Sequence, residues 1–396
     1  MIERTARTAL LRLASQFPVV GVTGPRQSGK TTLVRATFPE KRYVSFDDQD
    51  MRALALANPR DFVLAFPEGA IFDEAQKVPE LFDALKRQVD QDAATPGGFM
   101  PGKYVLTGSS QFRLKQNMTD SMAGRAAFLV LLPFAVEELR RAGALPETLY
   151  DCVLRGQYPP LHDPERRYVA EDWHDSYIAA YLERDVRDLI NPSNAATFKK
   201  FVRICAAYTG RMLSMDRIAR DVGVSAPTIK SWLSILESSY IIHFLEPAAD
   251  SLGRALVKSP KLYFVDSGLA CRLLRLETVS DLLLHSGKGA LVETFAVAEL
   301  LKSRTNRVKP PHLAYFRDRK GFEVDMIADW QRTFAIEVKS AAATDPRLAA
   351  NVGKYLALRG DAEARGAVFY PGDLTLDING VRYVGWRDWG AFAAEE

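Results

Sequence analysis

The segment GPRQSGKT, residues 24–31, constrains the fold more than any other part of the chain. It matches the pattern GxxxxGK[ST], follows the apolar run PVVGVTG and precedes a helical pattern. In such a loop the backbone N–H groups face the phosphates of a nucleotide, and the following helix N-terminus adds partial positive charge. The pattern predicts these nucleotide-binding residues: Gly24, Pro25, Arg26, Gln27, Ser28, Gly29, Lys30, Thr31 and Thr32.

Two side chains of this loop have individual roles in phosphate chemistry. Lys30 is expected to reach the β- and γ-phosphates and to act in catalysis, and Thr31 is expected to bind Mg²⁺. The sequence therefore predicts ATP and Mg²⁺ as cofactors.

Acidic and hydroxyl side chains follow two later strand-like runs. AIFDE ends in Asp73, which we expect near Mg²⁺, and Glu74, which we expect to orient and polarise the attacking water. YVLT is followed by GSS, so Ser109 or Ser110 would lie between Glu74 and the γ-phosphate; we take Ser110 as the catalytic candidate. Arg125 would stabilise transition-state charge, either in its own subunit or in a neighbour.

The wider pattern of residues 1–134 is that of an α/β domain. Strand-like runs alternate with amphipathic segments between residues 17 and 133, and such alternation predicts a parallel sheet covered by helices. With 47% hydrophobic and 26% charged residues, the chain has ordinary globular composition, which excludes disordered, collagen-like and coiled-coil classes. We predict a P-loop NTPase sheet here.

Residues 135–262 form a second, mostly helical region that includes a helix-turn-helix pattern. Residues 215–222 and 225–233 have helical spacing around Gly223, and later apolar stretches would form a wing, which predicts a winged helix. Between residues 198 and 262 Lys and Arg exceed Asp and Glu by five, which favours contacts with DNA phosphates. The alternative is a module that packs against protein. The expected DNA contacts are Thr228, Lys230 and Ser231.

Residues 263–396 read as a small α/β domain with acidic strands. Residues 323–327 and 335–339 alternate and flank a short turn, which predicts a hairpin in which Asp325 and Glu337 face the same site. With Lys339 two residues further on, this resembles the D…ExK core of restriction-type nucleases, and Glu293 matches the acidic residue those folds carry on the preceding helix. The alternative is a buried, salt-bridged cluster without catalysis.

Several blocks together resemble a prokaryotic family of AAA+-type ATPases whose C-terminal part was catalogued as a domain of unknown function. These blocks are GPRQSGKTTL, FDEAQKVPELF, TGSS and SMAGR, followed by YLERDV, KSPKLYFVDSGLA and GALVETFAVAEL. The resemblance covers nearly the whole chain. It implies similarity to ATPases that load or remodel on DNA, and a tail with a nuclease-like fold.

Net charge, the length of the apolar runs and the spacing of the cysteines restrict the remaining classes of protein and of metal site. The net charge is +3, the longest apolar run is about half of the roughly 20 residues that a membrane helix needs, and the three cysteines are too far apart for a zinc site. We expect a cytoplasmic protein with DNA as partner, a homo-oligomer or protein partner as further possibilities, and no membrane contact.

Three functions remain open at this stage. The first is an ATP-hydrolysing, DNA-associated protein that couples its nucleotide state to a winged-helix and nuclease-like tail. The second is a nucleotide-gated regulatory scaffold whose inactive nuclease fold binds a protein partner. The third is an ATP-licensed, Mg²⁺-dependent DNA nuclease.

Overall fold

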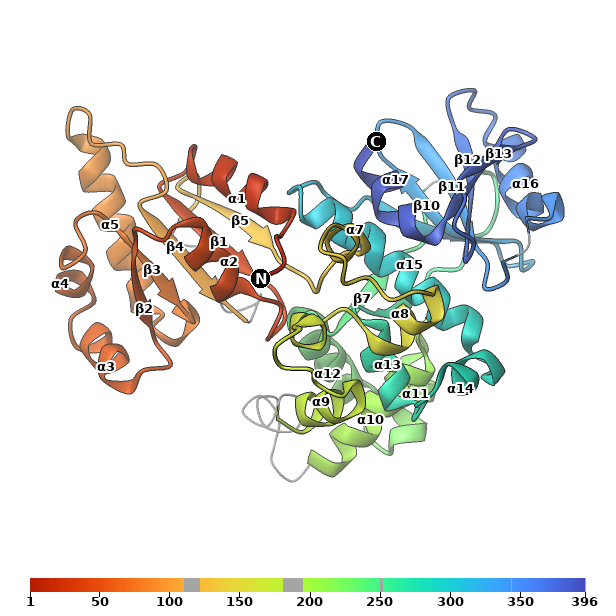
Figure 1. Cartoon of the computed structure of the whole chain (residues 1–396), viewed down its shortest axis with the longest axis horizontal. Helices are drawn as coiled ribbons and strands as arrows, with labels where there is room; N and C mark the ends of the chain where they lie inside the picture. Colours follow the sequence, from red (N-terminus) through yellow and green to blue (C-terminus); the bar gives the residue numbers. More distant parts are fainter. Residues whose placement is uncertain (110–121, 181–194, 250–251, 343, 396) are drawn as a thin grey trace. The chain divides into compact units, whose positions relative to one another are not determined.

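The computed structural model describes residues 1–109, 122–180, 195–249, 252–342 and 344–395. The chain forms two compact units (Figure 1). Unit 1 contains Met1–Pro133 and two short later segments, Ser238–Tyr240 and Thr305–Lys309, and unit 2 contains the rest. The division after Pro133 falls one residue before the expected boundary at 134.

Unit 1 is built on a five-stranded sheet in which all neighbouring strands run parallel, as the alternation of strands and helices predicted. Its order is β2-β3-β4-β1-β5, so β4 lies between the strand before the phosphate loop and the acidic strand. The strands are β1 Val19–Thr23, β2 Arg42–Ser45, β3 Ala70–Asp73, β4 Tyr104–Gly108 and β5 Ala126–Val130.

Both faces of this sheet are covered because buried parallel strands carry apolar side chains on each side. Val20 and Val22 pack with helices α1 and α2 on one face, whereas Val19 and Phe72 pack with α3, α4 and α5 on the other. Figure 1 shows α1 and α2 near β1 and the other three helices beside β2 and β3. The helices are α1 Ala6–Ala14, α2 Lys30–Thr37, α3 Gln49–Ala57, α4 Pro59–Leu64 and α5 Glu80–Ala94, with a 3₁₀ turn η1 at Ala75–Lys77.

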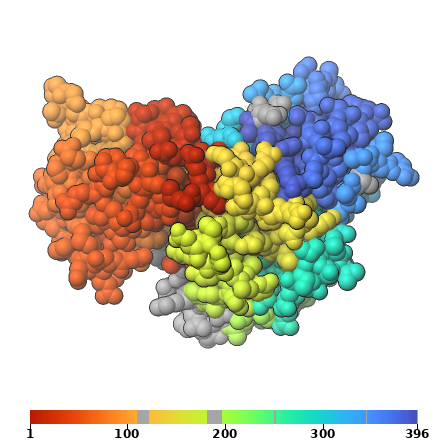
Figure 2. Space-filling view, in the orientation of Figure 1, coloured from red at the N-terminus to blue at the C-terminus, as the bar shows by residue number. Residues whose placement is uncertain are grey.

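The first half of unit 2 is mainly helical. Figure 2 shows α8 and α9, in yellow to yellow-green, at its surface. The elements are α7 Val136–Arg141, α8 Leu149–Arg155, η2 Pro159–His162, α9 Ala170–Tyr177, α10 Ala195–Ala207, β6 Arg211–Met212, α11 Met215–Val222, α12 Ala226–Ser238, β7 Ile242–Leu245, β8 Lys261–Phe264, α13 Ser267–Leu273 and α14 Val279–Leu284.

The two helices of the helix-turn-helix pattern lie where the sequence places them. Gly223 ends α11 in the left-handed region at φ 92°, a conformation that glycine adopts without strain. The hydroxyl of Ser225 then accepts a hydrogen bond from the Thr228 backbone N–H at 3.3 Å. From α10 to β8 the order is helix, strand, two helices and two strands, and the three strands form an antiparallel sheet in the order β6-β8-β7.

The second half of unit 2 contains a six-stranded mixed sheet in the order β13-β14-β12-β11-β10-β9. β10 and β11 form the expected antiparallel hairpin, with Met326 opposite Ile336. The elements are α15 Lys288–Thr305, β9 Leu313–Arg317, β10 Glu323–Asp329, β11 Thr333–Val338, η5 Pro346–Ala349, α16 Ala350–Arg359, β12 Arg365–Tyr370, β13 Leu376–Ile378, β14 Val381–Gly385, η6 Trp386–Asp388 and α17 Trp389–Glu395.

The expected domain boundary after residue 262 falls inside β8. This strand pairs with both β6 and β7, so cutting the chain there would split one sheet. Residues on both sides of the boundary belong to unit 2. Within the ranges that the structure describes, no helix has the length and apolar character needed to cross a membrane.

Candidate functional site

The phosphate loop connects the carboxyl end of β1 to the start of α2. Gly24 has a φ of 148°, and a Cβ atom there would lie 2.1 Å from the Leu131 carbonyl oxygen. Gly29 caps α2 at a φ of 91°, in the left-handed region. Glycine is therefore required by close backbone approach at the first position and favoured by conformation at the second.

Lys30 is the first residue of α2 and is only 6% exposed. Its ammonium group donates to the carbonyl oxygens of Gly24 and Pro25, at 3.1 and 2.8 Å. Burial lowers its pKa to about 8, although Glu74 and Asp73 act in the opposite direction. The side chain thus points back over the loop, where phosphate oxygens would replace the two carbonyl partners.

Asp73, at the end of β3, accepts hydrogen bonds from three hydroxyl groups. The Thr31 hydroxyl donates at 3.1 Å to each carboxylate oxygen, the Tyr43 hydroxyl donates at 2.6 Å, and Thr107 on β4 donates as well. Burial and Asp73 raise the pKa of Tyr43 to about 12, so its hydroxyl stays a donor. Hydroxyl and carboxylate oxygens are ligands that suit Mg²⁺, so Thr31 and Asp73 fit the expected metal position. The sequence analysis did not identify Tyr43 or Thr107.

Glu74 follows Asp73 with a φ of 54°, a left-handed conformation that is uncommon for glutamate. Its carboxylate accepts hydrogen bonds from the Ser109 hydroxyl, at 3.1 Å, and from the Gln76 amide. Ser109 is thus the serine beside Glu74 in the described part of the chain, and Ser110 lies outside the described residues. The carboxylate is oriented from two sides, as an acceptor for a water proton should be.

Arg125 lies at the wrong edge of the sheet for its own ATP site. Its carbonyl accepts a hydrogen bond from the Val19 N–H, at the start of β1, whereas the phosphate loop follows the other end of that strand. A five-residue strand is about 16 Å long, which exceeds the reach of an arginine side chain. The guanidinium instead pairs with Asp90 at 2.5 Å. This position favours a role in a neighbour over one in its own subunit, and either role stays a prediction.

The expected DNA contacts lie on α12. Lys230 and Ser231 are exposed and Thr228 is half-buried, while Ile229 and Trp232 on the same helix are buried. The exposed residues are therefore accessible to a partner.

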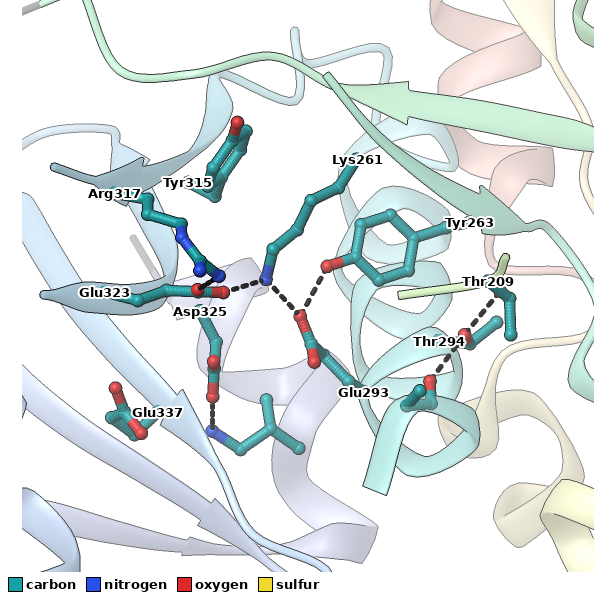
Figure 3. A network of polar contacts seen from close by, with 12 residues as sticks. Thr209, Lys261, Tyr263, Glu293, Thr294, Tyr315, Arg317, Glu323, Asp325 and Glu337 are labelled. Atoms are coloured by element: carbon teal, nitrogen blue, oxygen red, sulfur yellow. Dashed lines mark hydrogen bonds and ion pairs between the residues drawn. The ribbon is translucent and has the colours of Figure 1, made fainter. Parts of the chain in front are cut away.

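The four residues of the expected nuclease site come together in unit 2, and Figure 3 shows three of them, Glu293, Asp325 and Glu337. Asp325 lies opposite Glu337, one step beyond the Met326–Ile336 pair, and accepts a hydrogen bond from the Val338 N–H at 2.8 Å. Lys339 forms an ion pair with Glu337. Glu293 on α15 faces Asp325, and the Asp325 carboxylate disfavours the charged form of Glu293.

A lysine that the sequence analysis missed lies within this cluster. The Lys261 ammonium group, on β8, is 3.0 Å from Glu293 and 2.6 Å from Glu323, and the residue is 2% exposed. Tyr263 also donates to Glu293, and Arg317 pairs with Glu323 at 2.5 Å (Figure 3). A lysine in the otherwise apolar run KLYF was the available signal, because a charge in a buried strand requires a partner.

The charges in this cluster influence one another strongly. Burial, followed by repulsion from Asp325, raises the pKa values of Glu293 and Glu337 to about 7. Lys261 keeps a raised pKa despite burial because the surrounding carboxylates stabilise its positive charge. Among the described residues, no three His, Cys, Asp or Glu side chains are arranged as a metal-binding group.

Comparisons with protein families divide the chain into three consecutive parts. An AAA domain matches residues 16–140. Residues 146–280 match a domain of unknown function (DUF8612), and residues 288–389 match another domain of unknown function (DUF4143). The AAA domain agrees with the parallel sheet and the phosphate loop, so the chain carries a P-loop ATPase domain.

Solved structures give a more distant likeness. The Walker-type ATPase PABY2304 of Pyrococcus abyssi is 16% identical, with a TM-score of 0.48 over 69% of this chain and 96% of that one. AMPPCP-bound DnaA from Aquifex aeolicus is 14% identical, with a TM-score of 0.27 over 59% and 85% of the two chains.

Two curated relatives match over most of the sequence. The uncharacterized proteins Rv2008c of Mycobacterium tuberculosis and Mb2031c of Mycobacterium bovis are each 31% identical over 378 residues, which is 94% of this chain and 81% of theirs. This identity extends through all three domain matches. The chain belongs to the same protein family as Rv2008c and Mb2031c.

Proposed function

We propose that this protein hydrolyses ATP at the phosphate loop and uses its nucleotide state to control a DNA-binding winged-helix module. The AAA domain supports ATP binding and hydrolysis in general. The observation that carries the specific site is the convergence of Thr31, Asp73, Glu74 and Ser109 at the carboxyl ends of β1, β3 and β4.

Each of these residues has a definite task in hydrolysis. Lys30 would exchange its two loop carbonyls for phosphate oxygens and neutralise charge on them. Thr31 and Asp73 would hold Mg²⁺, which would supply positive charge against the negative charge of the phosphates. Glu74, kept in place by Ser109 and Gln76, would accept a proton from the attacking water.

A winged-helix role for residues 195–264 is supported by element order and by exposure. The order helix, strand, helix, helix, strand, strand is that of a winged helix, and Lys230 and Ser231 are exposed on the second helix of the pair. The local excess of positive charge favours a polyanion over a neutral partner.

Steady-state ATPase rates with single-stranded, duplex and branched DNA test this proposal. We expect DNA to raise the rate at low salt and the stimulation to fade as salt increases, because phosphate contacts release counterions. Lys230→Ala should weaken the stimulation, whereas Lys320→Ala, which removes an exposed lysine of another segment, should not. A rate that no DNA alters would reject the DNA-bound function, and full activity of Glu74→Gln would reject the assigned base.

A second candidate is a nucleotide-gated scaffold in which the nuclease-like tail does not cut. Lys261 favours this candidate, because it supplies inside the acidic cluster the positive charge that a nuclease takes from its metal ion. Mg²⁺-dependent DNA scission that Asp325→Ala abolishes without loss of folding would instead support the ATP-licensed nuclease.

A further inference from the structure

The chain connects unit 1 to unit 2 at three places. The chain leaves this unit at Pro133, returns for Ser238–Tyr240 and returns again for Thr305–Lys309. We call these three places crossings. These crossings are the covalent connections between unit 1 and the rest of the chain. A movement of the phosphate loop can therefore act on the rest of the chain through the crossings.

The second crossing contains a residue in a strained conformation. Tyr240, two residues after the end of α12, has a φ of 58°, and the Ile241 N–H donates to the Leu236 carbonyl at 2.9 Å. This is the hydrogen-bond pattern of a Schellman helix end, where the left-handed position is usually glycine. A tyrosine at this position indicates that its side chain compensates for the strain.

The Tyr240 side chain contacts the residue that precedes the phosphate loop. Its hydroxyl lies 2.7 Å from the Thr23 hydroxyl, and both residues are buried, at 8% and 2% exposure. Burial raises the pKa of Tyr240, so the phenol stays protonated at neutral pH. Thr23 is the last residue of β1, and the next residue is Gly24 of the loop.

The side chain of Arg4 joins the same loop to the residue that precedes the first crossing. This guanidinium donates to the Ser28 carbonyl at 2.8 Å and to the Leu132 carbonyl at 2.6 Å, and Arg4 is 7% exposed. Ser28 lies within the loop, and Leu132 immediately precedes Pro133. The Leu131 N–H also donates to the Thr23 carbonyl at 2.7 Å.

We propose that Tyr240 and Arg4 are positioning residues that link the phosphate loop, at Thr23 and Ser28, to the second and first crossings. Binding of phosphates replaces the hydrogen bonds of Lys30 to Gly24 and Pro25, so the loop must adjust between these two attachments. The adjustment then acts on Leu132 and on the turn between α12 and β7. The inference rests on the proposed ATP site and adds the route by which its state reaches the chain outside unit 1.

Hydrogen exchange of the full-length protein, with and without a non-hydrolysable ATP analogue, tests the second crossing. In the wild type we expect the analogue to change exchange at residues 236–245. In Tyr240→Phe, which removes only the hydroxyl, that change should be lost while analogue affinity stays within about threefold, because one neutral hydrogen bond is involved. Tyr383→Phe, which removes a buried hydroxyl bonded to the Asp345 carbonyl, is the matched control and should behave as wild type.

Kinetics distinguish positioning from a purely structural role. Tyr240→Phe and Thr23→Val should each lower kcat about fivefold with KM within twofold, as expected for loss of one hydrogen bond that positions the loop. The double variant should be no worse than either single variant, and Thr23→Ser, which keeps the hydroxyl, should restore the rate.

Defined results would overturn the inference. Additive effects of the two substitutions, or a nucleotide-dependent exchange change that persists in Tyr240→Phe, would remove Tyr240 from the route. No exchange change in an active wild type would reject the coupling but leave ATP hydrolysis intact. A wild type that hydrolyses no ATP would instead reject the proposed function.

The first crossing has its own test. Arg4→Met should abolish the nucleotide-dependent exchange change at residues 128–136, and Arg4→Lys, which keeps a cation but not the two-sided geometry, should restore it only in part. An unchanged response in Arg4→Met would overturn the assignment of Arg4.

Discussion

Tyr43 and Thr107 show how the ATP site depends on side chains that carry no motif. Both hydroxyl groups donate to Asp73, together with that of Thr31. Asp73 therefore has a fixed orientation before nucleotide binds. Such preorganisation is worth most when a charged group must hold a metal ion at one distance and angle.

Tyr43→Phe should lower kcat by about threefold to tenfold, because one hydrogen bond to a charged carboxylate is lost at roughly 1 kcal/mol. Because Tyr43 is exposed, the melting temperature should stay near that of the wild type. ATPase rates at saturating ATP and Mg²⁺ measure the effect. An unaltered kcat would show that Thr31 and Thr107 suffice to orient Asp73.

His162 gives unit 2 a predicted pH dependence. It is 8% exposed, its Nε2 atom is 2.9 Å from the Gly156 carbonyl, and burial lowers its pKa to about 4. In the unfolded chain the His162 imidazole becomes protonated near pH 6.5, whereas in the folded protein it stays neutral until about pH 4. Stability is therefore full above pH 6.5 and falls as the pH drops through this window.

Chemical denaturation at pH 7 and pH 5 measures this loss. We expect the free energy of unfolding to fall by roughly 1–2 kcal/mol between these values on account of His162, with part of that loss absent in His162→Gln. If the free energy of unfolding falls by the same amount in the wild type and in His162→Gln, other titratable groups cause the decrease.

At the scale of elements, the turn between β1 and α2 is fixed by Gly24. Gly24→Ala would place a Cβ atom 2.1 Å from the Leu131 carbonyl, so β1 and the end of β5 would have to separate. We expect a loss of several degrees in melting temperature and loss of ATP binding, because the loop is displaced from α2. Gly97→Ala is the control: it has a positive φ of 75° but no atom within 4 Å of the new Cβ, so it should cost only about 1 kcal/mol. Equal behaviour of the two variants would show that the close approach at Gly24 is not the constraint.

The local sequence was sufficient to predict the helices and strands. It was not sufficient to predict which residues distant in the sequence contact one another. The runs PVVGVT and AIFD alternate with helical segments, so the parallel sheet was predictable, and the alternation of residues 323–327 and 335–339 placed Asp325 opposite Glu337. The position of Arg125 beside the start of β1 could not be predicted, because the order of motifs along the chain does not tell at which end of the sheet a residue lies. Lys261 and Tyr240 were missed because their partners are 32 and 217 residues away.

At the scale of the whole molecule, the three sequence regions do not correspond to three independent bodies. β8 belongs to the sheet of the middle region, yet its Lys261 is held by Glu293 of α15 and Glu323 of β10. The ion pairs therefore join the helical half of unit 2 to its C-terminal sheet. Substitution of Lys261 should therefore lower the stability of both halves of unit 2 together.

Lys261→Met tests whether the acidic cluster is a structural ion-pair network or a metal site. The substitution leaves Glu293 without its cation and Glu323 with Arg317 as its remaining partner, and breaking a buried pair in this way costs up to about 3–5 kcal/mol. We expect a lower melting temperature in EDTA and, because a divalent cation can take the vacated place, a recovery with Mn²⁺ or Mg²⁺ in the absence of nucleotide. Asp325→Asn in the same background should reduce that recovery if the cation binds among these carboxylates. The wild type, whose lysine already fills the place, should respond little to either cation. A wild type stabilised as strongly as the variant would show that the cluster binds metal alongside Lys261, and would favour the nuclease over the scaffold.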